Sequence, residues 1–169
     1  NALNMMRAIR EFEHAGAAGV FFEDQGFPKR CGHFEGKKLV TAAEMAVKVR
    51  AACEARRSQD FLIIARTDAR TGKGLDEAIR RGVAYGEAGA DIVFIEAPET
   101  EEELAEVGRR IDKPLLVNMV NGGRTPMLPA ERLGKVLRAF AKEFPTVQLR
   151  LHAEALGAIV AMVLDRSAV

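Results

Sequence analysis

The sequence has 169 residues, of which 48% are hydrophobic and 29% charged, so it is long and apolar enough for one folded domain with a substantial core. Its formal net charge of +1 excludes a strongly basic surface of the kind that attracts nucleic acid or anionic membranes. No apolar run is long enough to cross a bilayer, and two cysteines, Cys31 and Cys53, are too few for a disulfide framework. We therefore expect a cytoplasmic protein whose partners include neither nucleic acid nor a membrane.

Helical and strand-like patterns alternate along the whole chain. In chain order we expect a helix over 1–16, a strand over 19–22, a helix over 41–57, a strand over 61–68, a helix over 74–90, a strand over 91–97, a helix over 100–111, a strand over 113–120, a helix over 129–144, a strand over 146–152 and a helix over 154–166. The second, third and fourth strands are nearly continuous apolar runs, which is typical of buried parallel strands. The sequence thus predicts a single α/β domain over 1–169. It would hold a five-stranded, mostly parallel sheet with helices on both faces, as in Rossmann-like or flavodoxin-like folds.

Polar residues of functional types stand where the first four strands end. They are Glu23 and Asp24, then Arg66, Thr67 and Asp68, then Glu96, and finally Asn118. In parallel α/β folds, ligands bind at the carboxyl ends of the strands. Helix caps and solvated loop residues would explain one such strand end, but four in succession favour a site that is either in use or inherited.

The stretch "EDQGFPKRCGH", residues 23–33, opens a connection that is longer than the usual βα loop. It combines Lys29, Cys31 and His33 within five residues. Positive neighbours suit a reactive thiol, although a passive loop cysteine is the alternative that the residue alone leaves open. Cys53 falls on the apolar stripe of its helix and is expected in the core.

Four stretches together resemble one known family. They are EDQGFPKRCGHFEGKKLV at 23–40, ARTDAR at 65–70, GADIVFIEA at 89–97 and PLLVNMVNGGRTP at 114–126. In this order they resemble the isocitrate lyase and phosphoenolpyruvate mutase superfamily over about residues 1–133, and most closely its methylisocitrate lyase and dimethylmalate lyase branch. The resemblance implies a (β/α)8 barrel that binds Mg²⁺ and cleaves a carbon–carbon bond of a 2-hydroxy acid by a retro-aldol reaction.

The resemblance also implies roles for individual residues. Cys31 matches the lid cysteine that protonates the enolate, and Lys29 and His33 match loop residues that help to settle the substrate. Arg66 matches the arginine that binds a substrate carboxylate, a task that suits a bidentate guanidinium. Glu96 and Asn118 match further pocket residues, and Glu23 matches an acid in the outer shell of the Mg²⁺ site, where carboxylates often act through water.

Two departures from the family pattern shape the functional prediction. The chain begins after the strand that carries the family's main Mg²⁺-binding aspartates, so Glu23 would form only part of a metal site. Residues 134–169 resemble the start of the inducer-binding domain of LysR-type regulators. We therefore expect a chimeric or engineered scaffold, a partial barrel over 1–133 joined to a regulator-like segment. Such a scaffold would keep relics of a lyase site but would be inactive and hold no cofactor.

Two other functions remain open. One is a working methylisocitrate or dimethylmalate type of lyase that uses Mg²⁺. The other is a small binding module that holds a carboxylate or phosphate with Arg66 and Arg124. The oligomeric state is open as well: the expected helix over 154–166 is apolar nearly all round, which suits either burial or a homodimer contact.

Overall fold

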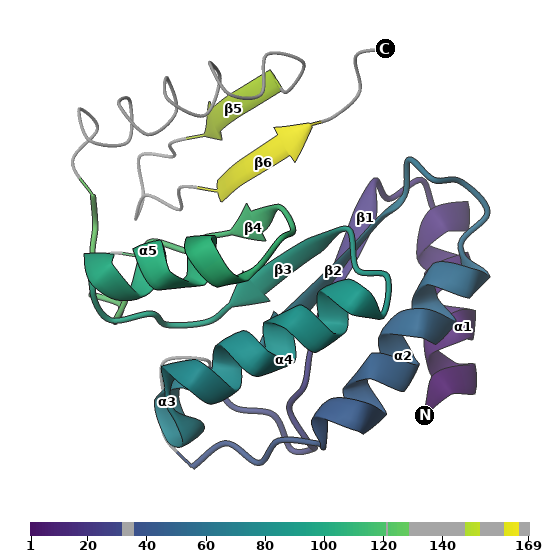
Figure 1. Ribbon diagram of the computed structural model, residues 1–169. Coiled ribbons are helices and arrows are strands. Elements are labelled where there is room, and N and C mark those ends of the chain that lie inside the picture. Colours follow the sequence, from purple (N-terminus) through teal and green to yellow (C-terminus); the bar gives the residue numbers. More distant parts are fainter. Residues whose placement is uncertain (32–35, 121, 129–147, 153–160, 166–169) are drawn as a thin grey trace.

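The computed structural model describes residues 1–31, 36–120, 122–128, 148–152 and 161–165. Four strands form a parallel sheet in sequence order, namely β1 (Gly19–Glu23), β2 (Leu62–Thr67), β3 (Ile92–Ile95) and β4 (Leu115–Leu116). The helices are α1 (Ala2–His14), α2 (Ala42–Ala55), the single turn α3 (Arg70–Lys73), α4 (Leu75–Glu87) and α5 (Glu101–Arg110). Two further strands, β5 (Gln148–His152) and β6 (Ala161–Asp165), form an antiparallel pair of their own (Figure 1). Within the described part of the chain, no helix has the length and apolar character needed to cross a membrane.

The described helices cover one face of the parallel sheet. Because the strand order never reverses, successive right-handed crossovers place each helix on the same side, where α1 packs on α2, α2 on α4 and α4 on α5 (Figure 1). Burial along β2 agrees, since Ile63 and Ala65 are buried whereas Ile64 between them is only partly covered. Phe21 of β1, on the same face as Ile64, remains 55% exposed.

The α/β class and the parallel sheet predicted from the sequence are confirmed, but two details were wrong. The helices do not flank the described sheet on both faces, because a Rossmann-like arrangement needs a reversal of strand order that is absent from β1–β4. A sheet in sequence order with helices outside is instead the wall of a barrel.

The predicted fifth strand and last helix also need correction. β5 forms within the expected strand over 146–152, yet it pairs with β6 rather than extending the parallel sheet. Residues 161–165 lie in the expected helix over 154–166 but form strand β6. A short apolar run such as "AMVLD" fits a buried strand as well as a helix, so periodicity alone cannot separate the two. The expected helix over 129–144 lies outside the described residues.

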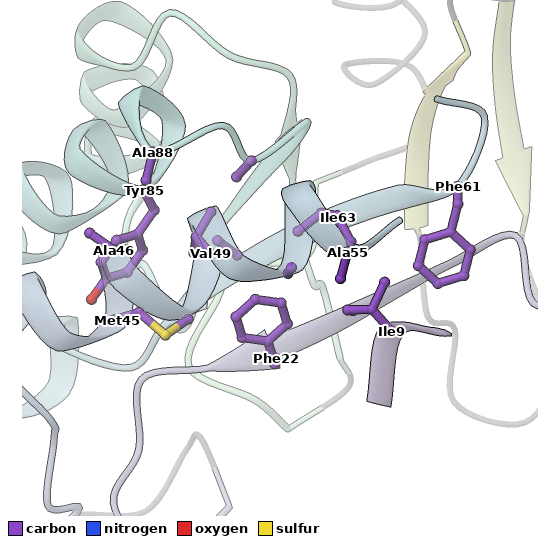
Figure 2. Close-up of a cluster of buried hydrophobic side chains, with 13 residues drawn as sticks. Ile9, Phe22, Met45, Ala46, Val49, Ala55, Phe61, Ile63, Tyr85 and Ala88 are labelled. Carbon is purple, nitrogen blue, oxygen red and sulfur yellow. The ribbon is translucent and has the colours of Figure 1, made fainter. Parts of the chain in front are cut away.

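The larger core cluster fills the space between β1, β2 and the helices α1, α2 and α4. Met45 and Val49 on α2 are four residues apart, so both point at the sheet and meet Phe22 and Ile63 (Figure 2). Tyr85 from α4 reaches into the same cluster and is fully buried. Each such side chain contributes roughly 1.5–3 kcal/mol by leaving water.

A smaller cluster joins α4 and α5 to β3 around Ile79, Val93 and Val107. Gly82 allows this close approach, because a Cβ there would lie 2.7 Å from the Ile111 Cδ1 atom and 3.1 Å from the Val93 Cγ1 atom. The two clusters together fix the positions of β1, β2 and β3, whose carboxyl ends carry the polar residues noted in the sequence.

Replacement of Gly19 tests the first β1–β2 contact. A Cβ at Gly19 would lie 2.6 Å from the backbone oxygen of Leu62, its partner on β2, so Gly19→Ala forces two strands apart. We expect a loss of about 1–3 kcal/mol in the free energy of unfolding, measured with urea. Gly108→Ala on α5 is the control, because nothing lies within 4 Å of a Cβ there and alanine favours helix. Equal stability of the two variants would contradict this packing.

Candidate active site at the carboxyl edge

The parallel register brings the polar strand ends to one edge of the sheet. Glu23 on β1 pairs with Arg66 on β2, and Arg66 pairs with Phe94 on β3, two residues before Glu96. Side chains alternate between the faces of a strand, so Glu23 and Arg66 share the face that the helices leave open. In a barrel this face points inward, toward the place where ligands bind.

Arg66 lies at the centre of this edge. Its Nε and Nη2 atoms donate to the two carboxylate oxygens of Asp68 at 3.1 and 2.9 Å, and its Nη1 lies 2.9 Å from Glu96 Oε2. The guanidinium also stacks over the Phe94 ring, 5.0 Å from its centroid. Burial disfavours the charge of Arg66, but the hydrogen bonds and charges of Asp68 and Glu96 outweigh it and raise the pKa of the guanidinium. Arg66 is therefore a permanent cation with a fixed orientation.

Glu23 is joined to the long loop that follows β1. Its Oε1 lies 2.8 Å from Lys29 Nζ, and Glu23 is the more buried partner. Cys31, two residues further along the loop, is exposed. His33 lies outside the described residues. Glu23 thus lies beside Arg66 on the neighbouring strand, and its ion pair with Lys29 joins the loop that carries Cys31 to this edge.

Asn118 follows β4 and is partly buried at the end of that strand. Because β4 lies at the opposite side of the sheet from β1, the predicted site residues are spread over the ends of all four parallel strands. Arg124, suggested for anion binding, makes an ion pair of 2.9 Å with Glu99 Oε1, and the other oxygen of Glu99 accepts from Arg70. Arg124 therefore belongs to a salt-bridge cluster that joins the connections after β2, β3 and β4.

Lys37 adds a positive charge that the sequence did not single out. Its Nζ donates to Thr71 Oγ1 at 2.9 Å, which ties the far arm of the long loop to α3. Burial lowers the pKa of the Lys37 ammonium, and the nearby carboxylates Asp68 and Glu96 partly offset that effect. The available signal was the place of Lys37 near the end of the long loop, shortly before the expected helix over 41–57, but the identity of its partner depends on the fold.

The buried carboxylate of Asp24 joins the ends of β1 and β2 to α4 on the helix-covered side of the sheet. Its Oδ2 accepts hydrogen bonds from Thr67 Oγ1 at 2.7 Å, Arg81 Nη1 at 2.9 Å and the Tyr85 hydroxyl at 2.8 Å. Its Oδ1 accepts from the backbone N–H of Asp68 at 3.0 Å. Asp24 has no exposed surface, so these four donors replace the water that a carboxylate would otherwise require.

Sequence reasoning missed Arg81 and Tyr85. The available signal was that Arg81 lies on the same face of α4 as Ala78 and Tyr85. A charged residue on such an apolar face needs a buried partner of opposite charge. That partner, Asp24, lies 57 residues earlier in the chain.

The described residues do not form a Mg²⁺ site by themselves. No group of three or more His, Cys, Asp or Glu side chains among them has the arrangement of a metal centre. Glu23 is engaged by Lys29, and the carboxylates of Asp68 and Glu96 face Arg66. Mg²⁺ needs several oxygen ligands in near-octahedral geometry, so Glu23 could contribute only one part of such a centre.

A parallel sheet in sequence order, with an arginine and carboxylates at its carboxyl edge, defines an α/β protein of barrel type with a candidate active site. The sequence matches the model of the phosphoenolpyruvate phosphomutase family over residues 1–139. The chain therefore belongs to this family, and the predicted resemblance to the phosphoenolpyruvate mutase and isocitrate lyase superfamily is confirmed.

Two relatives and a solved structure are similar to much of the chain. The 2,3-dimethylmalate lyase of Eubacterium barkeri is 56% identical over 128 residues, which is 76% of this chain and 44% of that protein. A 2-methylisocitrate lyase of Bacillus subtilis is 44% identical over 153 residues, which is 90% of this chain and 50% of that protein. A crystal structure of 2,3-dimethylmalate lyase superposes with a TM-score of 0.71 at 32% identity, covering 83% of this chain and 52% of that one. The chain spans about half the length of the curated relatives it matches.

The predicted fusion to a LysR-type regulator is not supported by these matches. The family model ends at residue 139, and the 153-residue alignment with the Bacillus protein extends past Leu133, where the second family was expected to begin. The resemblance of residues 134–169 to a regulator rested on a short strand-and-helix pattern, which many α/β proteins share.

Two neighbouring arginines on α4 test the role of Asp24. Arg81 and Arg80 both bind Glu77, but only Arg81 reaches Asp24. Arg81→Met leaves a buried carboxylate without its counter-charge, so we expect a loss of about 3–5 kcal/mol in the free energy of unfolding. Arg80→Met removes only a surface ion pair and should cost less than about 1 kcal/mol. Similar losses in the two variants would contradict the role assigned to Asp24.

Tyr85 should make the free energy of unfolding depend on pH. Burial and the negative charge of Asp24 raise the pKa of the Tyr85 hydroxyl well above its ordinary value. The unfolded chain releases this proton near pH 10 whereas the folded chain keeps it, so the free energy of unfolding should fall as the pH rises above about 10. In Tyr85→Phe this part of the slope should be missing.

The measurement is direct, because this chain has one tyrosine and no tryptophan. Phenolate absorbance near 295 nm should appear only as circular dichroism reports unfolding. A phenolate transition near pH 10 in a chain that is still folded would show that Tyr85 is not held by Asp24.

Proposed function

We propose that the chain carries the carboxylate-binding arginine and the cysteine loop of a carbon–carbon lyase. Its substrate would be a 2-hydroxy di- or tricarboxylic acid of the 2,3-dimethylmalate or 2-methylisocitrate kind. The observation that carries the proposal is the position of Arg66, fixed by Asp68 and Glu96 on the open face of the sheet, beside the Glu23–Lys29 pair. The similarity to a 2,3-dimethylmalate lyase at 56% identity supports this choice of reaction.

The reaction breaks the bond between the hydroxyl-bearing carbon and its neighbour. A base removes the hydroxyl proton, the carbon–oxygen bond becomes a carbonyl, and the electron pair of the broken bond passes to the other fragment as an enolate. With 2,3-dimethylmalate the products are pyruvate and, after protonation of the enolate, propionate. The proposal therefore needs a cation for the substrate carboxylates, a base that accepts the hydroxyl proton and an acid that delivers one proton to carbon.

Among the described residues we assign the cation and the acid, and we assign no base. Arg66 offers charge-assisted hydrogen bonds to a carboxylate, and its partners prevent it from turning away. Cys31 is exposed on the loop that follows β1 and is the proton donor in this proposal. Lys37 increases the positive potential near Asp68 and Glu96. No step is assigned to a metal, because the described residues do not complete a metal site.

The sequence had favoured an inactive, chimeric scaffold. Similarity to lyases across 76% and 90% of the chain supports membership of a lyase-containing family and gives no support to a fusion. Retention of the motif residues Glu23, Lys29, Cys31, Arg66 and Glu96 also favours an active site over a relic.

Release of a keto acid tests the proposal. The protein is incubated with 2,3-dimethylmalate, 2-methylisocitrate and isocitrate, with and without Mg²⁺, and pyruvate or glyoxylate is measured. Cys31→Ser should lower kcat by about 10²–10⁴-fold, the usual contribution of a general acid. Cys53→Ser is the matched control and should keep its activity, because Cys53 is half-buried and donates to the Gly89 carbonyl in the core.

Two results would count against the lyase. Absence of keto acid from all three substrates, in protein shown to be folded, would favour the inactive scaffold. Equal activity of wild type and Cys31→Ser would remove the cysteine from the reaction.

A further inference from the structure

The long loop after β1 is closed at its base by main-chain hydrogen bonds. Val40 N–H donates to the Asp24 carbonyl at 2.9 Å and Gly26 N–H donates to the Lys38 carbonyl at 2.7 Å, with Gln25 and Leu39 forming an antiparallel bridge between them. Arg81 adds to this closure, because its Nη1 reaches both the Asp24 carboxylate and the Val40 carbonyl. The two arms of the loop therefore leave the sheet as a short, fixed stem.

Within the loop, the Gln25 side chain makes a second and separate attachment. Its Nε2 donates to the Arg30 carbonyl at 2.9 Å, and its Oε1 accepts from the Arg30 N–H at 2.9 Å. Gln25 is only 7% exposed, so these bonds are partly shielded from competing water although Arg30 itself is exposed. A side-chain amide that matches both the donor and the acceptor of one residue fixes the position and the orientation of that residue's backbone.

The attachment acts on the residues that lead directly into Cys31. Lys29 is held by Glu23 at 2.8 Å, and Arg30 is held by Gln25. The Arg30 side chain crosses toward the other arm, where its Nη1 would lie 3.0 Å from a Cβ at Gly36. Closure of the stem does not need these contacts, since the main-chain bonds already provide it.

We propose that Gln25 is a positioning residue for Cys31, and that its two hydrogen bonds to the Arg30 backbone set where the Cys31 thiol stands over the carboxyl edge. The proposal rests on the function proposed above, in which that thiol delivers a proton to carbon. Gln25 itself does not touch the reacting atoms. It acts through the backbone of Arg30, and small errors in the position of a reacting group lower the rate strongly.

The test replaces Gln25 by methionine, which has a similar length and neither amide group. We expect kcat for keto-acid release to fall about 10–100-fold. KM should change by less than about twofold, because Arg66 and its partners are untouched. Gln59→Met is the matched control: Gln59 is exposed and accepts from Arg56 in another loop, so both kcat and KM should stay at the wild-type values.

Gln25→Glu serves as a second variant that keeps the shape of the side chain. Its carboxylate can still accept from the Arg30 N–H but cannot donate to the Arg30 carbonyl, so kcat should again fall. This variant decides the question if Gln25→Met does not fold. A purely structural role would instead change the free energy of unfolding and leave the kcat of the folded fraction unaltered.

Alkylation of the cysteines gives a readout that does not need activity. The rate at which iodoacetamide labels Cys31, followed by mass spectrometry, should change severalfold in Gln25→Met. The labelling rate of the half-buried Cys53 should stay constant. If the wild type is inactive but the Cys31 rate changes in this way, the lyase proposal fails and the positioning by Gln25 stands. Unchanged kcat in an active protein, or an unchanged Cys31 rate, overturns the inference.

Discussion

The arrangement of the site depends on the buried carboxylate of Asp24. Removal of a carboxylate from water costs several kcal/mol, and four donors from β2 and α4 are needed to offset this cost. The donors can reach Asp24 only when the ends of β1 and β2 are in register and α4 lies across them. Glu23 precedes Asp24 in the sequence, and Arg66 precedes Thr67. The same register therefore places Glu23 and Arg66 side by side on the face of the sheet that the helices leave open. The polar network on the helix-covered side of the sheet thus determines the positions of Glu23 and Arg66 on its open face.

Ion pairs fix the positions of the charged side chains at the carboxyl edge, as hydrogen bonds do for Asp24. Arg66 is surrounded by Asp68 and Glu96, and a guanidinium held on two sides can present its remaining surface in one direction only. The connections after the strands are joined in a similar way: Lys37 binds Thr71, and Arg70 binds Glu99 and Glu103. Loops at the carboxyl edge of a barrel usually carry the chemistry, and here charged side chains link them to one another.

Much of this could be predicted from local sequence. The apolar runs of β2 and β3 and the capping hydrogen bond from Glu44 N–H to Thr41 follow from composition and short-range spacing. The polar strand ends were visible because a parallel sheet must bring them to one edge. The motifs around Cys31 and Arg66 were specific enough to indicate the family. Residues 161–165 were assigned wrongly, because a five-residue apolar strand and one face of an apolar helix have the same local pattern.

The sequence by itself determined the α/β class and the residue types at the carboxyl edge, because periodicity and chain direction are local properties. The order of β1 to β4 within the sheet came from the structure. Only the tertiary structure decided that the helices share one face, that Asp24 pairs with Arg81 and Tyr85, and that Gln25 holds the backbone before Cys31. Side chains such as Arg81 and Gln25 can satisfy their hydrogen bonds with water as readily as with protein. Their partners are therefore selected only when packing excludes water and brings distant segments together.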